Sequence, residues 1–275
     1  MSYLHRASVG SAPAEADTVA PLPARLPRIK SPHLPTEADR RPPRSMPLTR
    51  RYEAMWLCRN GDIDSTVRIA PATPLFEEAF SALARGAVLQ SDMGPVAVED
   101  VVPGMRVLVA DGSFVAVTWV GSMTLYPGHS PEPDDKPVTL TRITADAFGA
   151  GRPMPDLVLG PRARICLRDS RLQGQFGLDA AFVPARAFVD GVSVIEVTPA
   201  APVSAYHLVL ERQAAIRVMG IEVESYHPGE GIEGMIDPRM LSLFEGLFPQ
   251  MHGLSGFGPL AHQRLTRFEV EHLFD

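Results

Sequence analysis

The sequence predicts an all-β fold, and three observations lead to that prediction. Short segments rich in Val, Ile and Thr follow one another from residue 87 to residue 224. Gly, Pro or Asp separates most of these segments, a spacing typical of β-sandwiches and β-barrels. No strand-like segment alternates with a long helical one, which argues against a parallel α/β fold.

The first 48 residues differ in composition from everything that follows. Residues 1–48 hold nine of the 27 prolines, and Arg and Ala fill much of the rest. Such a segment buries little apolar surface, so we expect an extended or disordered arm. Two interpretations of the arm stay open: a solvated tail, or a proline-rich ligand for a partner domain.

Residues 49–71 are predicted to form a β-hairpin that leads into the main domain. The segment "YEAMWLC-RNG-DIDSTVRIA" places two strand-like runs around Asn60-Gly61, a strong short-range hairpin signal. A short helix is expected next, in "TPLFEEAFSALARG". Thr73 is its expected N-cap, Pro74 its first residue, Glu77 its capping-box partner and Gly86 its stop.

The main β domain is predicted over residues 72–235, with a partly helical C-terminal extension over residues 236–275. In the extension, "IDPRMLSLFEGLFPQ" carries apolar residues at helical spacing after Asp237 and Pro238, which predicts a helix. The segment "PLAHQRLTRFEVEHLF" fits either a helix or a strand packed on the core.

Composition excludes several classes of function. The formal net charge of −6 disfavours a nucleic-acid surface. Cys58 and Cys166 are too few for a disulfide framework or a four-cysteine zinc site, although one bridge between them stays open. No run of about 18 apolar residues predicts a membrane span, and the N-terminus lacks the apolar core of a secretory signal. We therefore expect a cytoplasmic protein, with export that needs no N-terminal signal as the alternative.

Five sequence blocks in a fixed order resemble the Hint (Hedgehog/intein) domain family, and most of all its bacterial branch. The resemblance extends from about residue 72 to about residue 250 and implies a compact, pseudo-two-fold Hint-like β fold. The blocks are "PVAVEDVVPGMRVLV", "VAVTWVGSMTL", "DLVLGPRARICL", "FVPARAFVDG" and "YHLVLERQAAIRVMGIEVESYHPG".

The resemblance implies self-processing chemistry. In the family, the first residue of the module attacks the preceding carbonyl carbon and converts the peptide bond into a thioester or ester. A histidine in a later motif assists at the scissile amide as a general acid. Water, a lipid alcohol or a downstream side chain then takes the acyl group, and full splicing ends with cyclisation of an asparagine.

The family's reactive positions are substituted in this chain. The nucleophile position falls on Ser81 or, in a register shifted by one, on Ala82, and neither is the usual cysteine. The assisting histidine position, fourth in the Gly-Pro-Arg-Ala turn, is Ala163. A later family histidine is replaced by Gln213. Because the loss of a positioned acid or base costs about 10² to 10⁴ in rate, self-processing is expected to be lost or weak.

Other polar residues near these positions have mostly structural interpretations. His207 matches the family pattern, and as a site residue it would form hydrogen bonds within a cleft. Arg162 or Arg164 could stabilise an oxyanion, but both are expected to be solvated strand residues, and Ser81 is otherwise a serine in a surface helix turn. Splicing is excluded because the only asparagine, Asn60, precedes the module. Cys166 is expected to be a small buried hydrophobe.

One acidic loop raises the question of a metal ion. "PGHSPEPDDKP" brings His129 near Glu132, Asp134 and Asp135, a set that would suit a hard cation. Prolines interrupt the loop and the acidic run holds no turn glycine, so a solvated loop is the preferred interpretation. We expect no cofactor.

Two functions from different classes fit these observations. In the first, the chain is a degenerate Hint-like domain that no longer autoprocesses and acts as an interaction or regulatory module for an unknown protein partner. In the second, Ser81 performs an N-to-O acyl shift, with His207 nearby, and the chain is cut after Phe80. The second would release an N-terminal piece of 80 residues. A β scaffold unrelated to the Hint family is a third alternative.

Overall fold

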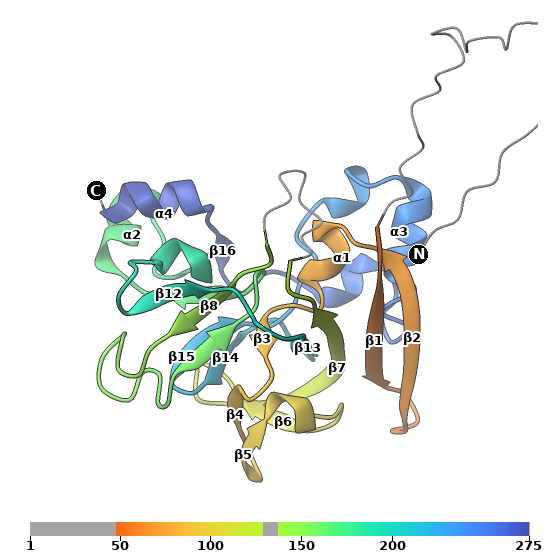
Figure 1. The fold of residues 1–275 in the computed structure, drawn as a ribbon. Helices are drawn as coiled ribbons and strands as arrows, with labels where there is room; N and C mark the ends of the chain where they lie inside the picture. The colour runs from red at the N-terminus through yellow and green to blue at the C-terminus, as the bar shows by residue number, and fades with distance from the viewer. Residues whose placement is uncertain (1–47, 129–136, 275) are drawn as a thin grey trace, which may run out of the picture. The chain divides into compact units, whose positions relative to one another are not determined.

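The computed structural model describes residues 48–128 and 137–274, which lie within one compact unit. These residues contain sixteen β-strands and four short α-helices (Figure 1), so the all-β prediction is confirmed. The predicted arm and the acidic loop with His129, Glu132, Asp134 and Asp135 lie outside the described residues, except for Leu48. The pseudo-two-fold relation and the domain boundaries stay predictions.

The first two strands form the hairpin that Asn60-Gly61 predicted. Strands β1 (Thr49–Leu57) and β2 (Ile63–Pro71) pair antiparallel along all nine residues of each strand. The turn closes through a 2.8 Å hydrogen bond from the Cys58 N–H to the Asp62 carbonyl oxygen. Gly61 has φ +88°, a conformation that favours glycine over residues with a side chain. The hairpin lies next to the rest of the sheet because the other edge of β1 pairs with β7 (Phe114–Leu125).

Helix α1 (Pro74–Glu78) follows the hairpin and begins with proline as predicted, but its capping differs from the prediction. The Thr73 side chain forms no cap hydrogen bond, and the Glu77 carboxylate pairs with Arg50 instead. The physical reason is spacing. A capping box uses the third helical residue, and Glu77 is the fourth residue after Thr73.

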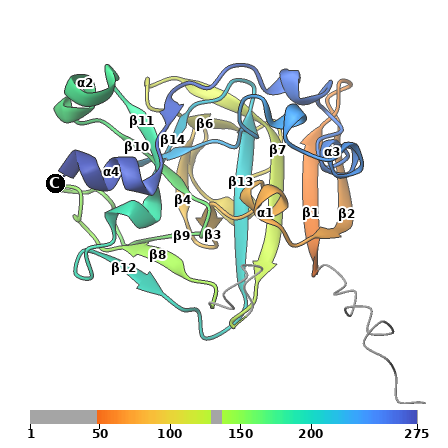
Figure 2. The same cartoon turned by 90° about the horizontal axis from the view of Figure 1, so that it is seen from above.

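A long antiparallel pairing joins a strand from the N-terminal half of the chain to one from the C-terminal half. Strand β7 pairs antiparallel with β13 (Val203–Leu210) from Leu125↔Val203 to Val117↔Leu210, with one irregularity near Val209. Figure 2 shows these two strands side by side near the middle of the molecule. The order along the sheet is β12-β8-β9-β3-β13-β7-β6-β4-β14-β15-β10-β11-β16, with β5 paired to β4.

The remaining strands are short, as the turn spacing predicted. They are β3 (Leu83–Ala84), β4 (Val88–Ser91), β5 (Gly94–Ala97), β6 (Arg106–Leu108), β8 (Leu140–Ile143), β9 (Leu157–Leu159), β10 (Arg164–Leu167), β11 (Ala181–Pro184), β12 (Val194–Val197), β14 (Ala215–Val218), β15 (Ile221–Glu224) and β16 (Gln263–Arg264).

Three helices lie in the C-terminal half of the chain. The helix expected after Asp237 is α3 (Pro238–Glu245), and the Asp237 side chain caps it by accepting from the Arg239 N–H. The ambiguous last segment is resolved as β16 followed by α4 (Arg267–Phe274). Sequence reasoning missed α2 (Ser170–Phe176), which has an Asp169 cap and ends at a left-handed Gly177.

A cluster of aromatic side chains, here called the aromatic core, draws on three parts of the chain. Trp119 lies at its centre, fully buried, and its indole Nε1–H donates to the Leu247 carbonyl oxygen at 2.8 Å. Segments before, within and after the predicted β domain therefore share one buried cluster. The members of the aromatic core are Tyr52, Phe76, Phe80, Trp119, Tyr226, Phe244, Phe248 and Phe257.

Both cysteines are free, so the open question of a bridge between Cys58 and Cys166 is answered. Cys166 is buried, as expected, and burial raises the pKa of its thiol to about 12. None of the described helices is long and apolar enough to cross a membrane.

Candidate functional site

Ser81 occupies the short link between α1 and β3, and backbone hydrogen bonds hold this link on three sides. The Phe80 N–H donates back to the Glu77 carbonyl oxygen at 3.0 Å, which closes the turn after α1. The Ala82 N–H donates to the Tyr206 carbonyl oxygen at 3.1 Å, which attaches the link to β13. The Ser81 carbonyl oxygen accepts from the Arg162 N–H at 3.2 Å.

The Ser81 side chain is buried rather than exposed. Its relative exposure is 0%, so the prediction that Ser81 lies in a surface helix turn is wrong. Its Oγ–H donates to the Glu77 carbonyl oxygen at 2.7 Å, back toward the last turn of α1. A carbonyl oxygen accepts this hydrogen bond but is far too weak a base to remove the proton, which a hydroxyl nucleophile requires.

The turn between β9 and β10 packs directly against this link. Gly160 donates its N–H to the Ala82 carbonyl oxygen at 2.7 Å. A Cβ at Gly160 would lie only 2.1 Å from the Ser81 carbonyl oxygen, so the turn approaches this closely only because residue 160 is glycine. The fold therefore brings together the predicted nucleophile position and the Gly160-Pro161-Arg162-Ala163 turn.

Ala163 lies in this turn and is 3% exposed. Its N–H donates to the Gly160 carbonyl oxygen, and its carbonyl oxygen accepts from the Ala185 N–H at 2.9 Å. Its methyl side chain offers no proton to any neighbour. The position that the motifs align with the family's assisting histidine is thus close to Ser81, but its side chain can neither donate nor accept a proton.

His207 contacts the chain just upstream of Ser81. Its Nδ1 lies 2.7 Å from the Glu78 carbonyl oxygen, and its Nε2 lies 3.2 Å from the Glu224 carbonyl oxygen. Burial lowers the pKa of His207 to about 4, although both carbonyl contacts oppose that shift. A neutral imidazole donates only one of the two hydrogen bonds, and the shorter contact assigns the proton to Nδ1. His207 thus holds the carbonyl oxygen of Glu78, two residues before Phe80.

A network of charged side chains surrounds His207, and sequence reasoning missed most of it. Arg164 pairs with the Glu78 carboxylate, and its Nη1 lies 3.9 Å from Glu224. Arg264 reaches the other oxygen of Glu224 at 2.9 Å. The expectation of a solvated Arg164 is therefore wrong, because only 24% of its side chain is exposed.

Gln213 belongs to the same network. Its Nε2 donates to Glu224 Oε1 at 3.0 Å, and its Oε1 accepts from the Ala261 N–H at 2.6 Å. Both ends of the amide are therefore engaged, and the side chain is 7% exposed. Gln213, which the sequence motifs align with a later family histidine, connects β15 to the chain near residue 261.

The charges in this network influence one another. Burial alone would raise the pKa of Glu78, but the guanidinium groups of Arg164 and Arg264 outweigh it, and the net shift is downward. Glu78 is therefore held as a carboxylate. One local signal could have pointed to this network, the pair Glu77-Glu78 a few residues before Ser81. Glu224 and Arg264 carry no local pattern.

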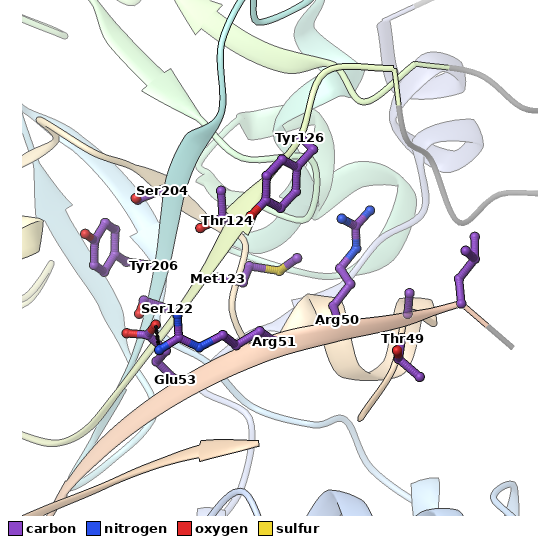
Figure 3. A pocket seen from close by; sticks show the side chains of 12 residues that line it. Thr49, Arg50, Arg51, Glu53, Ser122, Met123, Thr124, Tyr126, Ser204 and Tyr206 are labelled. Carbon is purple, nitrogen blue, oxygen red and sulfur yellow. Dashed lines mark ion pairs between the residues drawn. The ribbon is translucent and has the colours of Figure 1, made fainter. Parts of the chain in front are cut away.

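A separate pocket opens where β1 diverges from β7 (Figure 3). Strand β1 pairs with β7 from Tyr52 onward, so residues 49–51 separate from the end of β7 and leave a pocket of about 470 Å³. An ion pair between Arg51 and Glu53 lies on its wall. Neither Ser81 nor His207 lines it. The lining residues are Leu48, Thr49, Arg50, Arg51, Glu53, Ala72, Ser122, Met123, Thr124, Tyr126, Ser204 and Tyr206.

Comparison with protein families matches residues 81–230 to the Hint domain. The match spans more than half of the 275 residues. The chain belongs to the Hint domain family. Among solved structures, the chain is similar to a bacterial intein-like domain from Clostridium thermocellum, with 12% identity and a TM-score of 0.36. That similarity covers 54% of this chain and 99% of the other. No curated protein matches.

In this Hint domain, the matched range begins at Ser81, one of the two residues, with Ala82, on which the sequence motifs place the nucleophile position. The assignment of Ser81 and His207 as site residues stays a prediction. Within residues 48–128 and 137–274, no group of three or more His, Cys, Asp or Glu side chains is arranged to hold a metal ion.

Proposed function

We propose that this Hint domain no longer autoprocesses and serves as a folded interaction or regulatory module. The observation that carries the proposal is the state of Ser81. Its hydroxyl is fully buried and donates to the Glu77 carbonyl oxygen. An acyl shift needs a proton acceptor at that hydroxyl and a proton donor at the scissile nitrogen.

Of the described residues around Ser81, those that the family motifs align with reactive positions supply neither group. Ala163 has no titratable atom, and both ends of the Gln213 amide are engaged elsewhere. His207 is held at the Glu78 carbonyl oxygen, not at the Phe80 carbonyl whose carbon would be attacked. The Arg162 N–H donates to the Ser81 carbonyl oxygen, one peptide unit past the place where an oxyanion would form.

Autoproteolysis by Ser81 is the second candidate. The family match begins at Ser81, which supports the register in which a hydroxyl occupies the nucleophile position. The reaction would form an ester between the Phe80 carbonyl carbon and Ser81 Oγ, free the Ser81 amine, and end with hydrolysis after Phe80. That route needs a rotation of the Ser81 side chain away from Glu77.

Intact-mass measurement of the purified chain tests the proposal. We expect one species of 29.8 kDa, before and after hydroxylamine, and the same result for Ser81→Ala. Hydroxylamine cleaves esters, so it would expose an acyl shift that stops before hydrolysis. A fragment with a new N-terminus at Ser81, absent from Ser81→Ala, would overturn the proposal and support the second candidate.

A Ser81→Cys variant sharpens the test. It restores the usual thiol while leaving Ala163 and Gln213 in place. If the missing acid and base groups are what prevents the reaction, this variant also stays intact in the presence of a thiol reagent. Rapid cleavage of Ser81→Cys would instead mean that the missing thiol alone prevents the reaction.

A protein is the partner class that this proposal implies. The net charge of −6 disfavours nucleic acid. A role as a regulatory module depends on the Hint scaffold keeping its strands and turns, and the sixteen strands support that requirement.

A further inference from the structure

We infer that residues 49–80 bind residues 81–274 through a lasting noncovalent interface, so that a break in the chain after this segment leaves a complex and releases no N-terminal piece. The inference goes beyond the proposed function. It holds whether or not the Phe80–Ser81 bond is ever cut, because it concerns the contacts between the two segments.

Main-chain pairing is the first component of the interface. Five consecutive residues of β1 pair with β7, from Tyr52↔Met123 to Trp56↔Trp119. Departure of the hairpin would expose this edge of β7, while β13 would still cover the other edge. Unpaired strand edges are prone to aggregation, so the domain is more stable in solution with β1 paired to this edge.

Aromatic packing is the second component. Tyr52, Phe76 and Phe80 precede the family match, and each is at most 1% exposed. The Phe80 ring lies 5.3 Å from Trp119, and the Phe76 ring lies 5.7 Å from Phe244, both measured between ring centroids in edge-on contacts. These three side chains fill part of the aromatic core, and their loss would leave a cavity around Trp119.

Polar contacts form the third component. Glu78 pairs with Arg164 through its carboxylate and with His207 through its carbonyl oxygen. The Ser81 hydroxyl adds a hydrogen bond to the Glu77 carbonyl oxygen at 2.7 Å. Removal of Glu78 would leave the partly buried Arg164 and the buried His207 without these partners, which costs more than the loss of an exposed ion pair.

These three sets of contacts determine whether the N-terminal piece leaves after a cut. The second functional candidate predicts release of an 80-residue piece, whereas the contacts predict retention. The N-terminal segment thus behaves as a structural part of the Hint domain that happens to precede its first residue.

A controlled nick in the full-length chain tests the inference. The turn at Arg85-Gly86 is exposed, and a Cβ added at Gly86 would meet no atom within 4 Å. A site for a specific protease inserted between these two residues is cut without denaturant, after elution of the uncut protein at the wild-type volume shows that the insertion is tolerated. We expect both fragments to co-elute in equal amounts on gel filtration and to separate only in denaturant.

Variants in the nicked protein assign the retention to the interface of residues 49–80. Because the small fragment also carries β3, the comparison is between Phe80→Ala and Ile69→Ala, the latter at a side chain that is 75% exposed. Phe80→Ala should raise the dissociation rate at least tenfold, since removal of a buried aromatic ring costs more than the free energy of a tenfold change. Ile69→Ala should leave the rate unchanged.

Two outcomes would overturn the inference. One is separation of the wild-type fragments on the native column, or precipitation of either fragment after the cut. The other is equal dissociation rates for Phe80→Ala and Ile69→Ala, which would assign retention to β3 alone. Spontaneous cleavage at Ser81 would contradict the proposed function but leave this inference standing, because the nick is made by an added protease.

Discussion

Glu78 contacts the site through its carboxylate and its carbonyl oxygen, and no local pattern predicts the partner of either group. Its carboxylate pairs with Arg164, which lies 86 positions away along the chain, and its carbonyl oxygen meets His207 at 2.7 Å. For His207 the sequence favours a structural role, with hydrogen bonds within a cleft as the alternative. The structure shows one hydrogen-bond contact at each ring nitrogen, and both join the imidazole to a backbone carbonyl. At this scale, the neighbours of a residue decide its chemistry more than its type does.

The buried His207 makes folding stability depend on pH. Its folded pKa of about 4 lies below the ordinary value of 6.5, so the unfolded chain binds the proton first as pH falls. Stability should therefore fall as pH drops from 6.5 to 4, by up to roughly 3 kcal/mol. Urea unfolding at several pH values measures this slope, which should be smaller in His207→Gln.

An exposed histidine provides the control for that measurement. His272 lies on the surface of α4, and His272→Gln should keep the wild-type slope. The carboxyl groups of the network titrate in the wild type and in both variants, so the comparison isolates the imidazole. Parallel stability curves for the wild type and His207→Gln would show that His207 is not the source.

Among the elements, the predictable ones carry strong local signals. Asn60-Gly61 marks the β1–β2 turn, and Asp237-Pro238 marks the start of α3. Helix α2 has a start signal in Asp169 and a stop signal in Gly177, but its apolar pattern is weak, because Gly174 interrupts its seven residues and only Leu172 is buried. The turn between β9 and β10 depends on a contact that no local pattern encodes, the approach of Gly160 to the Ser81 link.

Substitution of Gly160 tests this close approach. In Gly160→Ala, the new Cβ would lie 2.1 Å from the Ser81 carbonyl oxygen, so the backbone must shift. We expect the free energy of unfolding to fall by about 1 to 3 kcal/mol or more, the range observed for overpacked sites. Thermal or urea unfolding measures it.

Gly174→Ala in α2 is the matched control. A Cβ there has no neighbouring atom within 4 Å, and the residue lies inside a helix. Alanine should therefore stabilise the chain by roughly 0.5 to 1 kcal/mol. Equal and small effects of the two substitutions would mean that the turn packs less tightly against Ser81 than the structure indicates.

Across the whole molecule, the aromatic core joins segments that the sequence assigned to different domains. The hairpin contributes Tyr52, α1 contributes Phe76, and the link after α1 contributes Phe80. Helix α3 and the residues after it contribute Phe244 and Phe248. The family match ends at residue 230, before those last two side chains. The predicted C-terminal extension therefore supplies core residues for the Hint domain that precedes it.

Two phenylalanines of the C-terminal segment test this dependence. Phe248 is 2% exposed and its ring lies 4.7 Å from Trp119, whereas Phe268 is 67% exposed. Phe248→Ala should destabilise the chain by about 3 to 5 kcal/mol, and Phe268→Ala by less than about 0.5 kcal/mol. Denaturant unfolding followed by Trp fluorescence measures both. A mild effect of Phe248→Ala would show that the segment after residue 236 is only appended to the domain.

The sequence by itself determined the β class, the hairpin, α3 and the membership of the Hint family, because each depends on spacing between near neighbours or on the order of motifs. It also predicts that Ser81, Ala163 and Gln213 occupy the family's reactive positions, and that assignment stays a prediction. Only the tertiary structure decided what surrounds them: the burial of Ser81, the ion pairs of Arg164 and the place of Phe248 beside Trp119. Those contacts join residues far apart in the chain. Their energy comes from burial and charge pairing, which exist only in the folded chain.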